Sequence, residues 1–298
     1  MAYQAKEKVN NALVVQTQIA VANLANSSRS YLEKQLPNHK IETLVQEVRM
    51  CIAKSTGQNK GTSLAECSPE SILGCMITCA SMGVSLNPDK KLAYLIPYRE
   101  GQKFVAQTNI SYLGLRNIIT RDTGIKMRGE CVYSKEPFEF YSNGFDQVYK
   151  HTPLPESERG DFMYAFSLAK LPDGEIMYER MTKEEVQKCR DASKGGASEY
   201  SPWTKWFESM ALKSVTRRQC KLLPNISNET VELLANDEAM AIGRPQFMET
   251  AYEKAGIKVE APPVKNEEEV SSAFTDIFGS DSEPIVENKS EIVNKEEK

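Results

Sequence analysis

Residues 91–109 read KLAYLIPYREGQKFVAQTN, and this stretch carries the clearest structural pattern in the chain. Positions 92, 94, 96 and 98 hold Leu, Tyr, Ile and Tyr, and the alternation resumes over residues 102–109 after the polar centre Arg99-Glu100-Gly101. Side chains repeat every two residues along a strand and about every 3.6 residues along a helix. The stretch therefore predicts a β-hairpin.

Helical patterns lie on both sides of this hairpin. Residues 41–55 have apolar side chains at helical spacing. A second helix is expected over residues 68–83, because Ser68 can cap it and Pro69 fits its first turn. A third helix should run from Ser111 to the Asp-Thr-Gly sequence that ends at residue 124.

The rest of the body mixes short strands with helices. Strands are expected at 127–133, 137–141, 161–170 and 175–180, and helices at 182–192, 202–222 and 229–241. Asp173-Gly174 is a strong turn signal between the last two strands. The pattern predicts an α+β fold in which an antiparallel β-sheet and hairpin core packs against helices.

Charge divides the chain into a basic body and an acidic end. The net charge is −4, from 41 acidic and 37 basic residues. Residues 226–298 hold 17 acidic and 7 basic residues, which leaves 24 and 30 for residues 1–225, so the body has a net charge of +6. A basic body with an acidic tail favours a polyanion-binding domain followed by an interaction or self-screening segment.

The sequence excludes several classes of protein. No apolar run approaches the roughly 18–20 residues of a membrane span, and the polar N-terminus is unlike a secretory signal. Seven scattered cysteines and two histidines favour buried free thiols over a metal site, and predict a cytoplasmic protein. No G-x-x-x-x-G-K-[ST] sequence is present to cradle a nucleotide phosphate.

One enzyme hypothesis remains, a Mg²⁺-dependent nuclease. Such enzymes often combine Pro-Asp with a strand that bears an acid, one residue and a lysine. Pro88-Asp89 precedes Glu100 and Lys103, but this spacing is one residue too long. Residues three apart on one strand point to opposite faces, which argues against this hypothesis.

The segment SPWTKWFESMALKSVTRRQCKLLP, residues 201–224, concentrates both tryptophans and five cations around a single acid, Glu208. On a helix, one face would hold Trp206, Met210, Lys213 and Arg217, with Lys221 close by, and the other face Ala211, Val215 and Leu222 as a core stripe. The cationic face is either a solvated surface or the wall of a groove that follows a phosphate backbone. Arg217 and Arg218 are about 100° apart, so one can face a ligand while the other pairs with the sheet or a neighbouring acid. Trp203, after Pro202, is interpreted as a structural pin at the helix start.

These residues and three further runs carry a resemblance to a known family. The runs are SLNPDKKLAYLIPY, ISYLGLRNIITRDTG and LAKLPDGEIMYERMTKEEVQ, and with residues 201–224 they cover roughly residues 30–225 in order. The chain resembles the RecT family of phage single-strand annealing proteins. The last block is the most specific, through Pro202-Trp203, Lys213, Arg217-Arg218 and Leu223-Pro224; Ser209 is an insertion relative to the family pattern.

The resemblance implies a non-enzymatic function in homologous recombination. Such proteins bind single-stranded DNA, anneal it to a complementary strand without ATP, and hold the annealed duplex, through a compact β-β-β-α-type core. They assemble as rings or helical filaments in the bacterial cytoplasm and act with a 5′→3′ exonuclease and the host single-strand binding protein. No cofactor is expected, and Mg²⁺ would serve only as a DNA counterion. The closest alternative is a passive single-stranded DNA-binding protein.

We therefore predict a DNA-binding set and four segments along the chain. The predicted DNA-binding residues are Lys91, Lys103, Tyr112, Arg116, Arg121, Lys126, Lys205, Trp206, Lys213, Arg217, Arg218 and Lys221. The segments are a flexible N-terminus (1–28), an annealing and oligomerisation domain (29–225), a helical extension (226–262) and an acidic disordered tail (263–298). The tail is either a solubilising end or a docking segment, with FTDIFG at 274–279 as the docking point.

Overall fold

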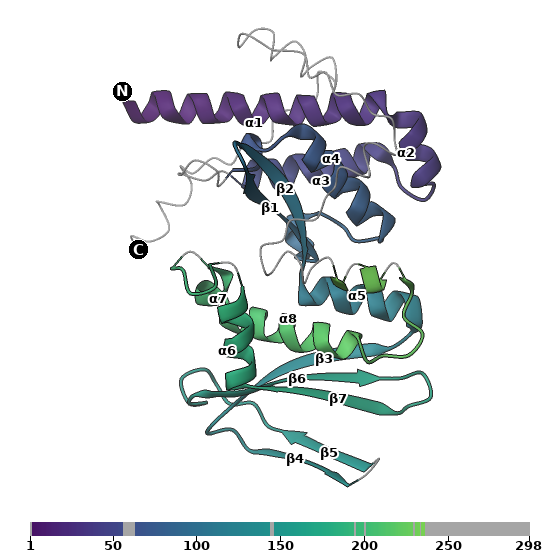
Figure 1. Ribbon diagram of the computed structural model, residues 1–298, viewed down its shortest axis with the longest axis vertical. Helices are drawn as coiled ribbons and strands as arrows, with labels where there is room; N and C mark the ends of the chain where they lie inside the picture. Colours follow the sequence, from purple (N-terminus) through teal and green to yellow (C-terminus); the bar gives the residue numbers. More distant parts are fainter. Residues whose placement is uncertain are drawn as a thin grey trace. The chain divides into compact units, whose positions relative to one another are not determined.

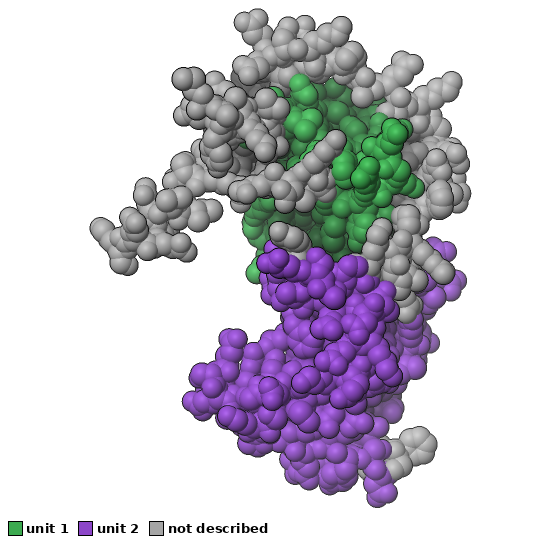
Figure 2. All heavy atoms as spheres, turned by 60° about the vertical axis from the view of Figure 1, so that its left-hand side comes forward, with its two compact units in different colours: residues 1–110, 247–298 green, residues 111–246 purple. Residues whose placement is uncertain are grey.

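The computed structural model describes residues 2–55, 63–143, 146–193, 195–199, 201–228, 230–232 and 234–235. The chain divides into two compact units, one of residues 1–110 and 247–298 and one of residues 111–246 (Figure 2). The annealing and oligomerisation domain predicted over residues 29–225 spans the boundary between these units after residue 110. Most of the predicted helical extension and the whole acidic tail lie outside the described residues.

The first unit contains helices and one hairpin. Its elements are α1 (Ala2–Ser27), α2 (Arg29–Gln35), α3 (Ile41–Lys54), η1 (Leu64–Glu66), α4 (Pro69–Ser81), η2 (Pro88–Lys90), β1 (Ala93–Glu100) and β2 (Lys103–Ile110). The predicted helices over 41–55 and 68–83 are confirmed, and the Ser68 hydroxyl accepts a hydrogen bond from the Ser71 amide at 3.3 Å. The predicted hairpin is confirmed as β1 and β2, paired antiparallel.

Helix α1 differs from the prediction of a loosely ordered N-terminus. It is the long helix of Figure 1, and it contacts α3 and α4. Val14, Gln18, Val21 and Ala25 are all buried and recur at helical spacing. The prediction of a flexible segment over residues 1–28 is therefore wrong for the described residues, because burial of this stripe stabilises a helix of modest apolar content.

The second unit is built on an antiparallel sheet. Its elements are α5 (Tyr112–Thr123), β3 (Lys126–Tyr133), β4 (Phe138–Asn143), β5 (Asp146–His151), β6 (Phe162–Lys170), β7 (Ile176–Thr182), α6 (Lys183–Ala192), α7 (Pro202–Lys205) and α8 (Phe207–Cys220). Strands β3, β6 and β7 form the sheet, and β4 and β5 form a separate hairpin between β3 and β6 in the chain. The predicted α+β class with antiparallel strands is confirmed, and β5 is the strand that the prediction missed.

Helix α8 lies on one face of this sheet and α5 packs against α8 (Figure 1). Ala211 and Val215 of α8 join Ala165 and Met181 of the sheet in a buried cluster. Gly129 makes close packing possible, since a Cβ atom there would lie 3.1 Å from Cδ2 of Leu212. Helices α5 and α8 thus form a helical layer over this face.

The hairpin β4–β5 covers the opposite face of the sheet through aromatic side chains. The ring centroids of Phe138 and Tyr149 lie 5.2 and 5.1 Å from that of Phe166, which is fully buried. Phe140 and Tyr178 extend the cluster along the sheet, with their centroids 5.9 Å apart. Edge-to-face and tilted pairs at such distances stabilise the packing beyond the apolar area they bury.

The predicted helix over 202–222 is interrupted at Trp206, whose φ of −137° and ψ of 54° are not helical. The break separates α7 from α8 and leaves Trp206 61% exposed, while Trp203 is buried and donates from Nε1 to Ser193 Oγ at 3.0 Å. Trp203 is thus the structural pin that the sequence indicated. The assignment of Leu222 to the core is wrong, because α8 ends at Cys220 and Leu222 is 57% exposed.

Candidate nucleic-acid interface

The single acid of the 201–224 segment, Glu208, is neutralised within the fold. Its Oε1 accepts hydrogen bonds from the Tyr133 hydroxyl and from Arg159, with which it also forms an ion pair. The Arg159 guanidinium lies 4.0 Å from the Tyr133 ring centroid. Burial, and then the hydrogen bond to Glu208, raise the pKa of Tyr133 well above its ordinary value. Glu208 is thus paired within the fold, and its neighbour Lys205 is exposed beside Trp206.

The two adjacent arginines of α8 have different surroundings. Arg218 forms ion pairs at 2.7 Å with Glu179 of β7 and at 2.7 Å with Glu185 of α6. The hydrogen bond to Glu185 raises the pKa of Arg218. The pKa of Glu185 is lowered, first by the hydrogen bond from the Thr182 amide and then by the hydrogen bond from Arg218. Arg217 is half-buried on another side of α8. The contacts assign Arg218 to the joint between α6, β7 and α8.

Exposure varies along the predicted row of cations on α8. Trp206 and Lys221 are exposed, Met210 packs against the buried cluster, and Arg217 is half-buried. Lys213 is only 7% exposed. Helix α8 contacts the sheet and also contacts α5, so more than one of its sides is covered. The predicted row of cations on α8 is therefore uneven in exposure.

Helix α5 brings a second group of predicted residues to the helical layer. Tyr112 and Arg116 are half-buried, and Arg121 is exposed and pairs with Asp122 at 2.6 Å. Arg116 Nε and Thr216 Oγ1 are buried and make no hydrogen bond within the described part of the chain. The helical layer thus combines Tyr112, Arg116 and Arg121 with Lys205, Trp206, Lys213, Arg217 and Lys221.

Lys126 lies on the other side of the sheet. Gly129 of β3 faces Leu212 of α8, whereas Glu130 contacts Tyr149 and His151 of the hairpin. Since side chains alternate along a strand, Lys126 shares the hairpin face with Glu130. The structure therefore separates Lys126 from the helical layer.

Lys91 and Lys103 belong to the first unit, and both are exposed. Lys91 has a left-handed φ of 55° at the end of η2, and Lys103 begins β2. Lys103 is the cross-strand partner of Glu100, so the two side chains share a face across the hairpin turn. The argument that they point to opposite faces is therefore wrong, since they lie on two strands and not on one.

The nuclease hypothesis gains no support from this correction. Asp89 forms an ion pair with Lys54 at 2.7 Å. Within the described ranges, no group of three or more His, Cys, Asp or Glu side chains could hold a metal ion. All seven cysteines are free, and burial raises the pKa of Cys51, Cys67 and Cys75 to about 12, as expected for inert buried thiols.

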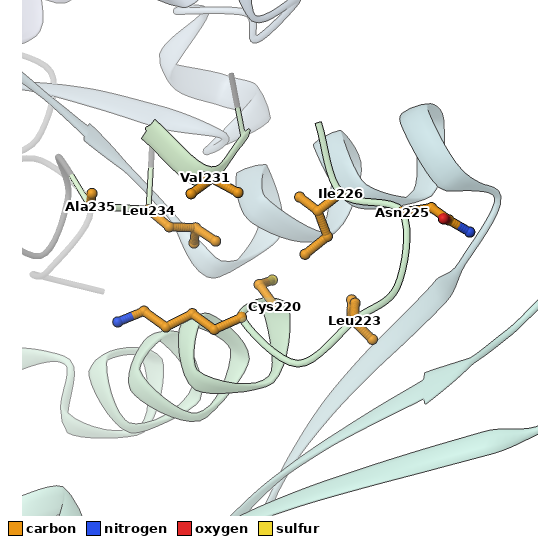
Figure 3. Close-up of a pocket in the computed structure, with 8 residues that line it drawn as sticks. Cys220, Leu223, Asn225, Ile226, Val231, Leu234 and Ala235 are labelled. Atoms are coloured by element: carbon orange, nitrogen blue, oxygen red, sulfur yellow. The ribbon is translucent and has the colours of Figure 1, made fainter. Parts of the chain in front are cut away.

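A pocket of about 430 Å³ opens beyond the end of α8 (Figure 3). Its lining is largely apolar and consists of Cys220, Lys221, Leu223, Asn225, Ile226, Val231, Leu234 and Ala235. Ligand sites of this size normally combine apolar walls with several converging polar groups. Lys221 and Asn225 are the polar residues of this lining, which makes the pocket a poor candidate for small-molecule chemistry.

Some polar contacts of the second unit gave no sequence signal. Arg159 precedes Glu208 by 49 residues, and nothing in the local pattern of either predicts their pairing. The same holds for His151, which bonds to Glu130 and Glu136 under the hairpin. Both groups depend on the packing of segments that are distant along the chain.

Comparisons with known proteins identify the family of the chain. A sequence model of the RecT family matches residues 49–255. The chain is 28% identical over 218 residues to Protein RecT of Escherichia coli strain K12, covering 71% of this chain and 77% of that protein. No helix among the described residues is both long and apolar enough to cross a membrane.

Proposed function

This chain belongs to the RecT family, and from that premise we propose that it binds single-stranded DNA and anneals complementary strands without ATP. The helical layer of α5 and α8, with α7, supplies the DNA surface. The first unit supplies further phosphate contacts through Lys91 and Lys103, which are exposed. The annealed duplex stays bound to the same cations after pairing.

The observation that carries the proposal is the cluster of cations beside an exposed tryptophan on the helical layer. Glu208 pairs with Arg159, and Asp122 pairs with Arg121. Glu179 and Glu185 are both held by Arg218. Lys205 and Lys221 are exposed and Arg217 is half-buried on the same layer, where Trp206 is 61% exposed. A surface of this kind attracts a polyanion.

The annealing mechanism follows from phosphate neutralisation. Cations that follow one strand's backbone leave its bases open to a second strand. Neutralisation also lowers the repulsion between the two strands, and base pairing supplies the sequence recognition. Trp206, the exposed aromatic of the layer, can stack on a base or ribose. No step requires a nucleotide, which fits the absence of a phosphate-binding P-loop from the sequence.

Neighbouring copies of the chain extend this surface along the strand in a ring or filament. Binding should therefore be cooperative and depend on strand length. Mg²⁺ acts only as a DNA counterion, and a 5′→3′ exonuclease and a host single-strand binding protein are the partners. The protein works in the cytoplasm of a bacterial host.

The decisive experiment mixes two complementary strands, each precoated with the protein, in the absence of ATP. An annealing protein accelerates duplex formation relative to naked strands. A passive single-strand binding protein slows it or leaves it unchanged, and that result would replace the proposal with the passive alternative. Labelled DNA incubated with protein and Mg²⁺ should remain intact, and cleavage would restore the nuclease hypothesis.

The surface is tested by Lys205→Glu in the same assay, with Lys170→Glu as the matched control. Both lysines are exposed, but Lys170 lies at the end of β6, where its cross-strand partner is Lys126. Lys205→Glu should slow annealing, whereas Lys170→Glu should not. Equal defects would show that total charge matters and the helical layer does not.

A further inference from the structure

Arg116, in the middle of α5, is a half-buried arginine without a counter-charge. Its Nε is buried and makes no hydrogen bond, and no hydrogen bond or ion pair joins the side chain to another described residue. A guanidinium is always charged in proteins and carries five N–H donors but no acceptor. Buried polar atoms nearly always have a partner, so a buried donor without one needs an explanation.

The helix that carries Arg116 supplies no acid to pair with it. Side chains three and four residues apart are neighbours on a helix surface. Positions 112, 113, 119 and 120, one turn from Arg116, hold Tyr, Leu, Ile and Thr. Asp122 is the single acid of α5, and it pairs with Arg121 at 2.6 Å. Within α5, the charge of Arg116 is therefore uncompensated.

The elements packed against α5 do not compensate Arg116 either. Helix α5 packs on α8 and on β3, and each of these contains one acid, Glu208 in α8 and Glu130 in β3. Glu208 forms its ion pair with Arg159, and Glu130 accepts a hydrogen bond from Tyr149 on the hairpin face of the sheet. Partial burial of a charge without a counter-charge is unfavourable. The stability of the fold therefore does not explain an arginine at this position.

The chemistry of the side chain matches an oxyanion ligand. The planar guanidinium binds a phosphate through two parallel N–H···O bonds, and it loses less hydration than an ammonium group does. Arg116 belongs to the helical layer, and its half-buried side chain still reaches solvent. Tyr112 is half-buried one turn earlier on the same side of α5, which gives a bound nucleotide an aromatic neighbour.

We propose that Arg116 binds one backbone phosphate of single-stranded DNA through two hydrogen bonds, at a cost to the stability of the free chain. This inference rests on the proposed function, and it adds a defined phosphate site to a surface whose other cations act through their charge. Removing the side chain should therefore weaken DNA binding without weakening the fold. A residue that only stabilised the fold would show the opposite pattern.

Arg116→Met tests this separation, because Met keeps the apolar stem of the side chain and removes the charge. Without DNA, the Tm from calorimetry should equal or exceed that of wild type, since an uncompensated charge is lost. The affinity for a labelled single strand, from fluorescence anisotropy, should fall roughly tenfold or more, as expected when a charge-assisted hydrogen bond is removed. A lower Tm together with unchanged affinity would make Arg116 a structural residue and overturn the proposal.

Two control variants separate a phosphate site from general effects. Arg128→Met removes the same charge from the hairpin face, where the Arg128 side chain is 72% exposed, and should keep nearly wild-type affinity. Thr216→Val removes a second buried polar atom that lacks a hydrogen bond, on α8. Thr216 is fully buried and out of reach of a ligand, so DNA affinity should not change. Equal losses in Arg116→Met and Arg128→Met would show that total charge accounts for the effect, and would overturn the proposal.

Arg116→Lys tests the two-bond contact. Lysine keeps the charge but replaces the planar fork by a compact ammonium group. The slope of log affinity against log salt should therefore match that of wild type, while the affinity at fixed salt should be lower. Wild-type affinity in Arg116→Lys would contradict binding through the fork.

The source of the phosphate is tested by thermal protection. Single-stranded DNA should raise the Tm of wild type more than that of Arg116→Met, whereas inorganic phosphate at the same ionic strength should not. The reverse pattern would assign Arg116 to a free anion and overturn the proposal. A wild-type chain that binds no single-stranded DNA would contradict the proposed function and this inference together. Wild-type binding and annealing, with unchanged affinity in Arg116→Met, would contradict the inference alone.

Discussion

Replacing Arg217 and Arg218 separately by glutamine should give two opposite defects, although the residues are adjacent on α8. Arg218 holds Glu179, whose side chain is 13% exposed, and Glu185, whose side chain is 37% exposed. Arg217 faces about 100° away from Arg218 around the helix axis. Arg218 should therefore contribute to the stability of the fold, and Arg217 to DNA affinity.

The magnitudes follow from exposure and from counterion release. Breaking a fully buried ion pair costs about 3–5 kcal/mol. The Arg218 side chain is 45% exposed, so screening reduces the expected loss to about 1–2 kcal/mol, or a decrease in Tm of roughly 2–8 °C. Arg217→Gln, by contrast, removes one cation from the proposed DNA surface. It should lower the slope of log affinity against log salt by about 0.7 for single strands.

Calorimetry and fluorescence anisotropy with a labelled oligonucleotide measure the two effects. Each phosphate contact adds roughly 0.7 to the slope for single strands. When salt is raised from 50 to 200 mM, the DNA affinity of Arg217→Gln should therefore fall by a factor about 2.6 times smaller than the DNA affinity of wild type. Arg218→Gln should show the lower Tm and the wild-type slope. If Arg218→Gln lost slope and kept its Tm, the division of roles between the two arginines would be refuted.

Three other outcomes are expected. The pKa values of Glu130 and Glu136 are lowered in the folded chain, so the unfolded chain binds more protons in acid. The free energy of unfolding should therefore decrease as pH falls below about 4.5. Urea titrations at several pH values measure this, and a free energy of unfolding that did not change with pH would contradict it. Trp203→Phe removes the hydrogen bond to Ser193, so the free energy of unfolding from chemical denaturation should fall by about 1–3 kcal/mol. An unchanged free energy of unfolding would show that Trp203 is not a structural pin. Deleting residues 263–298 removes 10 acidic and 4 basic residues, so DNA affinity at low salt should rise. If DNA affinity and exonuclease association both stayed unchanged, the tail would be only a solubilising segment.

Local signals predicted the elements that contain their own start and stop residues. Ser68 and Pro69 begin α4, and Ser111 and Gly124 bound α5 through a side-chain cap and a left-handed φ of 73°. The hairpin of β1 and β2 follows from alternation alone. Each of these signals acts within a few residues, so it can be recognised in the sequence without knowledge of tertiary contacts.

The burial and pairing of charged side chains depend on tertiary packing, so they could not be predicted from the sequence. The pattern of α8 contains one core face, and it gives no sign that α8 also contacts α5 or that Lys213 is buried. The pairing of Glu208 with Arg159 joins residues 49 apart, so the compensation of the acid is not visible in the 201–224 segment. The predicted DNA-binding set therefore stays a prediction, with Arg218 and Lys126 placed outside the surface that the helical layer forms.

Mapping photocrosslinks from single-stranded DNA with a photoreactive base tests the central claim most directly. If the helical layer binds DNA, crosslinked peptides should contain Trp206 and Tyr112, since these are the aromatic side chains of the predicted set on that layer. Competition by unlabelled single strands should remove these crosslinks. Crosslinks confined to the hairpin face of the sheet, around Tyr141 and Lys126, with none on α5, α7 or α8, would contradict the claim.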